Sequence, residues 1–445
     1  MGSPHRHNLL QKLLCTATCC LVVAVSGKPG IAQGTKTEKT DDNQQIVESL
    51  TVDQAVNEAI RNNLGLQAEQ MNVQVAESSI TTAKLRPNPV ISVADNYLFY
   101  LNGYNLNKGA NPSEIAGHID FPIEYWGKRR LRIETAKYSK TIADAQLLDS
   151  IRKLRLAVAT SCADILQDKA SLSLARDNLQ TFEELVRIND VRVKAGSLNP
   201  LDLARSKVAM FQFQNNVKRA ELELSKARIK LQNLLGRKNV SDTFDIQGEL
   251  KLFPLKTDLD LKTLQDAAIA IRPDLQAIEL AKERAQSDKK LQHANAKVDY
   301  NVGVQYQRTL AEDNFDSMGL SFSVPLPIYN RNQGEIARAH AEHEQLLRRE
   351  LDVRTQILNE VKTAYYSFCM GRELVENIEH NLLSPAEDAR NTAAYIYRTG
   401  ASSLIEFLDA QRTFNETKQS YNEALATYYD AVYNLNAVVG REIIP

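Results

Sequence analysis

Two acidic side chains near the end of the chain are the best candidates for chemistry. Glu406 and Asp409 lie three residues apart at the start of an expected helix, so they share one of its faces. Carboxylates that meet at a narrow passage favour cations and slow anions. Glu406 also has a local explanation, because it ends a capping box that starts at Ser403. Asp202, with Asn199, has the same local explanation at the matching helix of the first half.

Other constellations predict little chemistry. His340 and His343 are one helical turn apart with glutamates nearby. This spacing can hold a metal, but we interpret the pair as a solvated face and predict no metal site. Cys162 and Cys369 fall within long expected helices, and we interpret both as small apolar packing residues. The chain has no nucleophile–base arrangement and no Gly-rich phosphate loop. We therefore expect neither an enzyme nor a bound cofactor.

Composition favours a helical protein and argues against a nucleic-acid partner. The chain has 445 residues, of which 43% are apolar, and only 18 Gly, 13 Pro and one Trp. These are low numbers for an enzyme of this size. Lys and Arg total 54 against 55 Asp and Glu, a net charge of -1. Such a balance offers no electrostatic attraction for nucleic acid.

The N-terminus has the pattern of an export signal. Arg6 and Lys12 precede a mostly apolar run of 13 residues (13–25), and Gly30-Ile31-Ala32 supplies small residues for cleavage. We predict a signal peptide over residues 1–32 and a linker over residues 33–49. A lipid on Cys19 or Cys20 is the alternative, although the three residues before Cys19 make a poor lipobox.

The remaining chain is an internal repeat of long helices. Shifting residues 196–237 by 204 positions places Gly196 on Gly400 and Gly236 on Gly440. A unit of about 200 residues is too long for a solenoid, so we infer duplication of one whole structural unit. Residues 128–195 contain no Gly or Pro, and apolar residues fill eleven of fourteen positions stepped by four and three from Leu147. This stripe predicts a coiled-coil helix.

Each half is expected to contribute one helical hairpin. The first turns at Gly196 and restarts at Asn199-Pro200. The second has arms over 335–399 and 403–439. At Gly371 and Pro385 we expect a bend or a change of packing in its first arm. An amphipathic helix opens each half, over 51–85 and 261–296. We place the first repeat at 50–238 with its tip near 196–200, a linker at 239–260, the second repeat at 261–442 with its tip near 400–403, and a tail at 443–445.

Between opening helix and hairpin, the apolar period changes to two. Residues 298–308 and 316–325 alternate cleanly, whereas 90–101 and 113–123 alternate less well because Asp95 interrupts the apolar face. Strands of about ten residues can cross a bilayer in a barrel. The alternative is a soluble sandwich hairpin, but the chain supplies no partner sheet. Tyr125-Trp126 and Tyr329 fit an interfacial aromatic girdle. Four strands cannot close a barrel, so two or three copies must join.

With these features the chain resembles the TolC-type outer-membrane efflux family over residues 50–442. The local signatures are LRPNP at 85–89, FPIEYWGKR at 121–129 and VPLPIYNRNQG at 324–334. The last two are similar to segments of the heavy-metal branch, which serves cobalt-zinc-cadmium or copper-silver efflux. The resemblance implies a mainly α fold with a small transmembrane β part. Long coiled-coil hairpins would form an α-barrel, and four strands per chain would contribute to a trimeric, twelve-stranded β-barrel.

The resemblance further implies a passive exit duct in the bacterial outer membrane with a long periplasmic extension. Its partners would be two further copies, outer-membrane lipid, a periplasmic adaptor and, indirectly, an inner-membrane RND pump. Heavy-metal cations are the expected cargo. The same duct for drug efflux or type I protein secretion is one alternative. A periplasmic coiled-coil scaffold or adaptor is another.

The family also assigns roles at the hairpin tips. Glu406 and Asp409 match acidic residues that ring the closed periplasmic entrance. Tyr397 matches a tyrosine that latches the entrance by bonding the acidic residue matched by Asp202. Ser402 replaces the usual arginine, which predicts a more easily opened tip. Contacts with the adaptor are expected at five tip residues: Arg192, Gly196, Arg398, Gly400 and Ser402.

Overall fold

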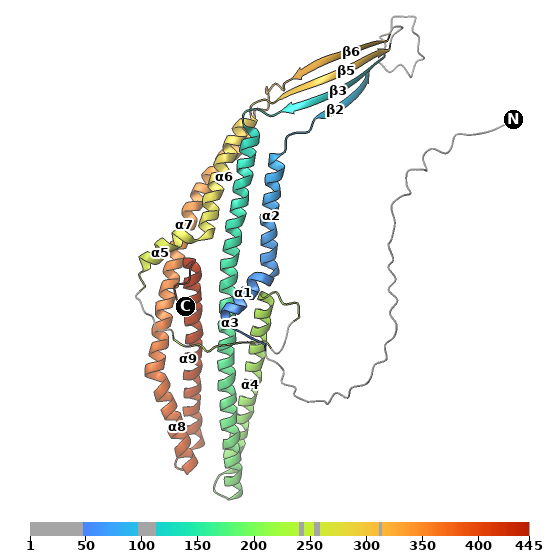
Figure 1. The fold of residues 1–445 in the computed structure, drawn as a ribbon. Helices are drawn as coiled ribbons and strands as arrows, with labels where there is room; N and C mark the ends of the chain where they lie inside the picture. Colours follow the sequence, from blue (N-terminus) through green and yellow to red (C-terminus); the bar gives the residue numbers. More distant parts are fainter. Residues whose placement is uncertain (1–47, 97–112, 240–243, 253–258, 311–313, 445) are drawn as a thin grey trace, which may run out of the picture. The chain divides into compact units, whose positions relative to one another are not determined.

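Figure 1 shows the computed structural model of the chain, which describes residues 48–96, 113–239, 244–252, 259–310 and 314–444. The expected signal peptide, nearly all of the linker after it and residues 97–101 of the first expected strand lie outside the described residues. The mainly helical fold with a small β part is confirmed.

The first hairpin consists of α3 (Lys128–Lys194) and α4 (Pro200–Leu234). Asn199 caps α4 by accepting a hydrogen bond from the backbone N–H of Leu201 at 2.9 Å. The second hairpin consists of α7 (Gln333–Ile378), a π-helical turn η1 (Glu379–Leu383), α8 (Ser384–Thr399) and α9 (Leu404–Val439). The helices lie in the order α4, α3, α9 and then α7 with α8, as their contacts and Figure 1 show.

α7 continues through Gly371, where the sequence predicts a bend or a change of packing. Gly371 is a site of close packing, where an added Cβ would lie 3.4 Å from Cα of Tyr428. The irregularity falls at η1, immediately before Pro385. Proline offers no N–H to the preceding turn, and a π turn is one way of accommodating that loss.

Both opening helices are broken. In the first half α1 (Val52–Asn62) and α2 (Leu64–Lys84) meet at Asn63, and in the second α5 (Leu261–Ile271) and α6 (Pro273–Asn295) meet at Arg272. A single helix was expected in each half, and only the second break has a proline beside it, Pro273. Asn63 caps α2 through Leu66 N–H and also donates to the carbonyl oxygen of Leu234, both at 2.9 Å. The first break therefore depends on a tertiary contact with the end of α4.

A short parallel sheet joins the start of the first repeat to the segment between the repeats. It pairs β1 (Glu48–Leu50) with β4 (Phe244–Ile246). Asp245 of β4 is held by Lys169 at 2.8 Å and Arg228 at 3.1 Å, from α3 and α4. These two cations hold the pKa of Asp245 below its usual value against the opposing effect of burial.

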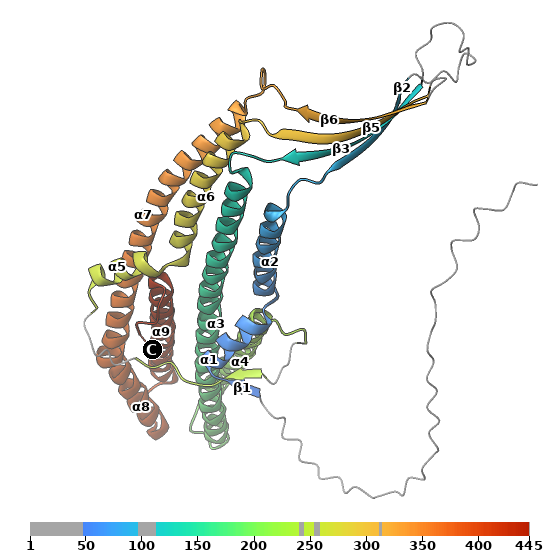
Figure 2. The same ribbon diagram turned by 45° about the horizontal axis from the view of Figure 1, so that its top comes forward.

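The four longer strands form one antiparallel sheet in the order β2-β3-β5-β6 (Figure 2). Their bounds are Val90–Asn96, Ser113–Ile123, Tyr300–Leu310 and Phe315–Ser323. The expected strand at 298–308 is thus shifted by two residues. The register places apolar residues opposite one another across all four strands: Ile91, Ile119, Val304 and Leu320 form one such row. The next row along the strands is polar and consists of Ser92, His118, Gln305 and Gly319.

The apolar face of this sheet is exposed. Leu320 is 87% and Ile91 is 73% exposed, and Ile119 and Val304 in the central strands are each 41% exposed. The soluble-sandwich alternative required this face to be packed against a second sheet, and the described chain packs no sheet on it. Among the described residues, no helix combines the length and the apolar character that crossing a membrane requires.

Two apolar cores hold the hairpins to their opening helices. The first gathers residues of α1, α3, α4 and β4 around the fully buried Leu231 and Phe244. The second gathers α5, α7 and α9 around Val432 and Leu435. A third, much smaller cluster at the hairpin tips contains residues of both hairpins.

Candidate functional site at the hairpin tips

The two hairpins turn with the same backbone device. Gly196 has φ +73° and Gly400 has φ +86°, a left-handed conformation that favours glycine. Both glycines are exposed. The glycines thus end α3 and α8 sharply and bring the starts of α4 and α9 to the tips.

Five buried apolar residues, here called the tip cluster, connect the tips: Phe182, Leu185, Tyr397, Leu404 and Phe407. The Phe182 ring stacks on Phe213 with centroids 4.2 Å apart, and it lies 6.0 Å from the ring of Phe407. Tyr397 stacks on Phe407 with centroids 5.8 Å apart. The start of α9 is therefore packed against α3 of the same chain.

The hydroxyl of Tyr397 binds a different partner from the one expected. It donates to Oδ1 of Asn189 at 2.9 Å, and we call these two residues the tip pair. Asp202, the expected latch acceptor, lies near its neighbour Arg205 at 3.7 Å, an i,i+3 pair on α4. Burial raises the pKa of Tyr397, and the charge of Asp202 raises it slightly further. In this structure the tyrosine is therefore tied to α3 by a neutral amide.

Arg192 ties the tips together within one chain. Its guanidinium donates to the carbonyl oxygens of Tyr397, at 3.3 Å, and of Arg398. The guanidinium carbon also lies 5.8 Å from the centroid of the Tyr397 ring, within the range of a cation–π contact. These carbonyls belong to the last turn of α8, where the helix dipole favours a cation. Contact with an adaptor would have to compete with these bonds.

The two acidic candidates have different local partners. Glu406 completes a capping box, because Ser403 Oγ accepts from Glu406 N–H while the Glu406 carboxylate accepts from Ser403 N–H, both at 3.3 Å. Asp409 forms an exposed ion pair with Arg412 at 2.8 Å, and its own side chain is 67% exposed. Capping therefore explains Glu406 locally but gives no account of Asp409.

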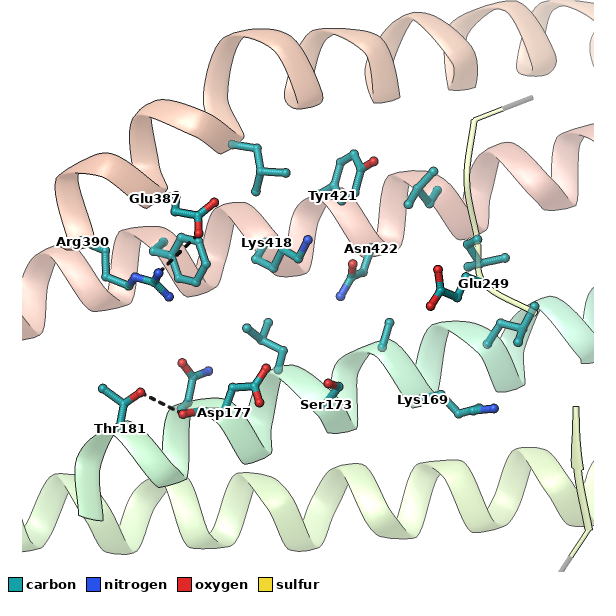
Figure 3. Close-up of a pocket in the computed structure, with 18 of the residues that line it drawn as sticks. Lys169, Ser173, Asp177, Thr181, Glu249, Glu387, Arg390, Lys418, Tyr421 and Asn422 are labelled. Atoms are coloured by element: carbon teal, nitrogen blue, oxygen red, sulfur yellow. Dashed lines mark hydrogen bonds and ion pairs between the residues drawn. The ribbon is translucent and has the colours of Figure 1, made fainter. Parts of the chain in front are cut away.

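A second polar pair joins the hairpins further from the tips. Gln411 Nε2 donates to Asn178 Oδ1 at 2.8 Å, and both residues are more than nine-tenths buried. We call Asn178 and Gln411 the second pair. Beyond it, a cavity of about 650 Å³ separates α3 from α8 and α9. Figure 3 shows polar and charged side chains facing each other across it, among them Asp177 and Ser173 from α3 and Lys418 and Asn422 from α9.

The remaining predicted contact residues lie at the surface of the tips. Arg398 is exposed, while the Oγ atom of Ser402 is buried without a hydrogen-bond partner in the described part of the chain. Sequence reasoning missed Asn178, Asn189 and Gln411. For Asn189 a signal was present, since it is one of three polar residues in the apolar stripe of α3.

Comparison with known proteins agrees with this architecture. The profile of the family described as "Outer membrane efflux protein" matches residues 55–237 and 264–441, one block in each repeat. The two blocks together cover most of the chain and leave out the segment between the repeats.

Individual relatives are distant but extend over nearly the whole chain. The cobalt-zinc-cadmium resistance protein CzcC of Cupriavidus metallidurans is 25% identical over 400 residues, which cover 88% of this chain and 90% of CzcC. The pyoverdine export outer membrane protein OpmQ of Pseudomonas aeruginosa is 22% identical over 81% of this chain and 79% of its own. A crystal structure of CusC superposes with a TM-score of 0.71 at 17% identity, over 88% of this chain and 92% of CusC.

Proposed function

Because the chain belongs to the outer membrane efflux protein family, we propose that it is the passive exit duct of a tripartite efflux system and that it carries heavy-metal cations. The exposed apolar face of the sheet is the observation that supports the duct most directly. Side chains such as Leu320 and Met318 (79% exposed) are suited to lipid, whereas the opposite face presents serine, glutamine and glycine to water.

The duct requires further copies of the chain. The sheet has two edge strands, β2 and β6, whose outer backbone groups pair with no other strand of the described chain. In lipid each unpaired group costs several kcal/mol, so the edges must meet those of neighbouring copies. Three copies give twelve strands and the trimer that the family resemblance implies.

The helical part also has exposed apolar residues on both of its sides, where neighbouring copies could pack. The helix at one side of the hairpin layer, α4, exposes Val208, Phe211, Leu222 and Ile229, each more than half exposed. The helix at the other side, α7, exposes Tyr366, Met370 and Leu374 at four-residue spacing. Exposed apolar stripes on both sides favour a ring in which α4 of one copy packs beside α7 of the next.

In such a trimer the tips would surround the periplasmic entrance. Two carboxylates per chain, Glu406 and Asp409, would place six around one aperture and favour cations over anions. The name of the relative CzcC, a cobalt-zinc-cadmium resistance protein, agrees with a cationic cargo. A periplasmic adaptor would bind at the tips and connect the duct to an inner-membrane RND pump, which supplies the energy.

The aperture proposal is tested by neutralising the carboxylates without removing the helix cap. Glutamine serves as well as glutamate in a capping box, so Glu406→Gln combined with Asp409→Asn removes only charge. In planar bilayers we expect this variant to conduct better and to be blocked less by multivalent cations. The matched control is Glu373→Gln, an exposed carboxylate of α7 far from the tip.

The outcomes test the channel and the proposed ring of aperture carboxylates separately. A conducting protein whose block is unchanged by the double substitution would limit these carboxylates to local roles at the start of α9. Purification of the wild-type protein as a water-soluble monomer that forms no channel would overturn the duct itself. Heat-modifiable trimers in outer-membrane fractions are the result that we expect.

A further inference from the structure

We infer that the tip pair and the second pair together form an uncharged clasp that positions the start of α9 against α3 of the same chain. The inference deepens the proposed function, since α9 begins with the two aperture carboxylates. Asn178 and Asn189 are eleven residues apart on α3, which is three helical turns or about 16 Å. The clasp therefore holds α8 and α9 at two levels.

Burial shows that the clasp lies inside the contact between the hairpins. Asn189 is 0% exposed and Tyr397 is 3% exposed, while Gln411 is 2% and Asn178 is 7% exposed. Tyr397 also belongs to the tip cluster, so the hydrogen bond of the tip pair is surrounded by apolar side chains. In such surroundings, loss of one partner leaves the other with the full cost of desolvation.

Each pair uses only part of its bonding capacity. Nδ2 of Asn189 and Oε1 of Gln411 are buried and have no hydrogen-bond partner within the described part of the chain. A buried polar atom in this state opposes closure, because separation of the hairpins would let water reach it. The clasp thus specifies how the hairpins fit together while keeping their contact weak.

The surroundings allow the hairpins to part at this point. On the side away from the tips, the 650 Å³ cavity of Figure 3 lies between α3 and the helices α8 and α9. On the other side the tip cluster and the Arg192 bonds connect the hairpins. The clasp is therefore the polar part of the contact near the tips, which the cavity separates from the contacts that α3 and α9 make further along, such as the bond from Arg152 to the carbonyl oxygen of Ala437.

A double-mutant cycle at the tip pair tests the clasp. The reporter is Leu185→Cys, a tip-cluster residue that is 5% exposed, in a background with Cys162 and Cys369 changed to Ala. We expect Asn189→Leu alone and Tyr397→Phe alone each to raise the rate of maleimide labelling roughly tenfold, because each orphans its partner. The two changes together replace both polar groups by apolar ones of similar shape. The double variant should then label no faster than the reporter protein.

Controls and contrary outcomes are specific to the clasp. Tyr395→Phe, at a residue 70% exposed two positions from the tip pair, and Asn216→Leu at an exposed position of α4 outside its apolar stripe should leave the rate unchanged. Additive effects in the double variant, or single variants that label like the reporter protein, would overturn the inference. Labelling needs no transport. If the labelling rates follow the expected pattern in a protein that shows no channel activity, the proposed duct is refuted and the clasp is supported.

Discussion

The two hairpins occupy matching places in the two halves of the chain, but they differ in the continuity of their first arms. In the first hairpin α3 runs without interruption for 67 residues, whereas the second hairpin divides the equivalent arm into α7, η1 and α8. A π turn adds a residue to the helical repeat and rotates the side chains that follow it. The halves thus keep the same glycine turns while presenting different faces to each other, which explains why their contact at the tips is not symmetric.

The largest difference in stability between the two hairpins is expected at the matched glycines at the ends of α4 and α9. Gly236 and Gly440 have φ +73° and +83°, so alanine is strained at both. At Gly236 an added Cβ would also lie 2.3 Å from the carbonyl oxygen of Asn62, whereas at Gly440 its nearest neighbour is Ile271 Cγ2 at 3.5 Å. We expect Gly236→Ala to cost more than about 3 kcal/mol of unfolding free energy and Gly440→Ala about 1 kcal/mol.

Urea unfolding of the purified variants measures this difference. Equal losses would show that the ends of the two repeats are packed alike and that the close approach of Gly236 to Asn62 is not present in solution. Gly196→Ala provides a reference for strain alone, because no atom lies within 4 Å of its added Cβ.

The end of α4, where Gly236 approaches Asn62, shows what could and could not be predicted from sequence. Glycine and proline residues predicted both hairpin turns, because these residues act through their own backbones. The break at Arg272 likewise has a local signal in Pro273, although a single helix was expected over 261–296. The break at Asn63 has no proline and depends on the carbonyl of Leu234, 171 residues away. At Gly371 the sequence predicted a bend or a change of packing without deciding between them, because the close approach of Tyr428 depends on a helix far along the chain.

The candidate site likewise contains features that local sequence predicts and features that depend on distant residues. Its capping box and tip glycines follow from local sequence, and the structure contains both. The bond between Asn189 and Tyr397 spans 208 residues and depends on how two long helices are aligned. Period counting marks Asn189 as a polar exception in an apolar stripe, but it cannot supply the partner.

A medium effect is expected from two half-buried aspartates, one in each hairpin. Burial, aided by the charge of Asp164, raises the pKa of Asp168 on α3 and of Asp430 on α9 to about 6. A raised carboxyl pKa means that the ionised form destabilises the fold above pH 6, and that this penalty disappears as the pH falls towards 4. We expect Asp168→Asn and Asp430→Asn each to add about 1 kcal/mol at pH 7.5, after allowance for solvent screening.

Thermal unfolding of both variants at pH 7.5 and pH 4 checks the sign. The gain over the wild-type protein should be present at the higher pH and absent at the lower one. A gain that persists at pH 4 would mean that the amide improves packing rather than removing a charge. Gain in only one of the two variants would show that the hairpins differ in polarity as well as in continuity.

The smallest expected effect compares the caps of the two returning helices. Ser403 shares a reciprocal capping box with Glu406, whereas Asn199 accepts a single hydrogen bond from Leu201 N–H. Ser403→Ala should destabilise the first turn of α9 by about 0.5 kcal/mol, and Asn199→Ala should do the same for α4. Hydrogen exchange of the first-turn amides measures each loss locally. Glu406→Gln should leave exchange in α9 unchanged, because the amide oxygen can still accept from Ser403 N–H. Faster exchange in this variant would mean that the charge itself holds the turn, and the conductance of the neutralised aperture would then report helix fraying as well as lost charge.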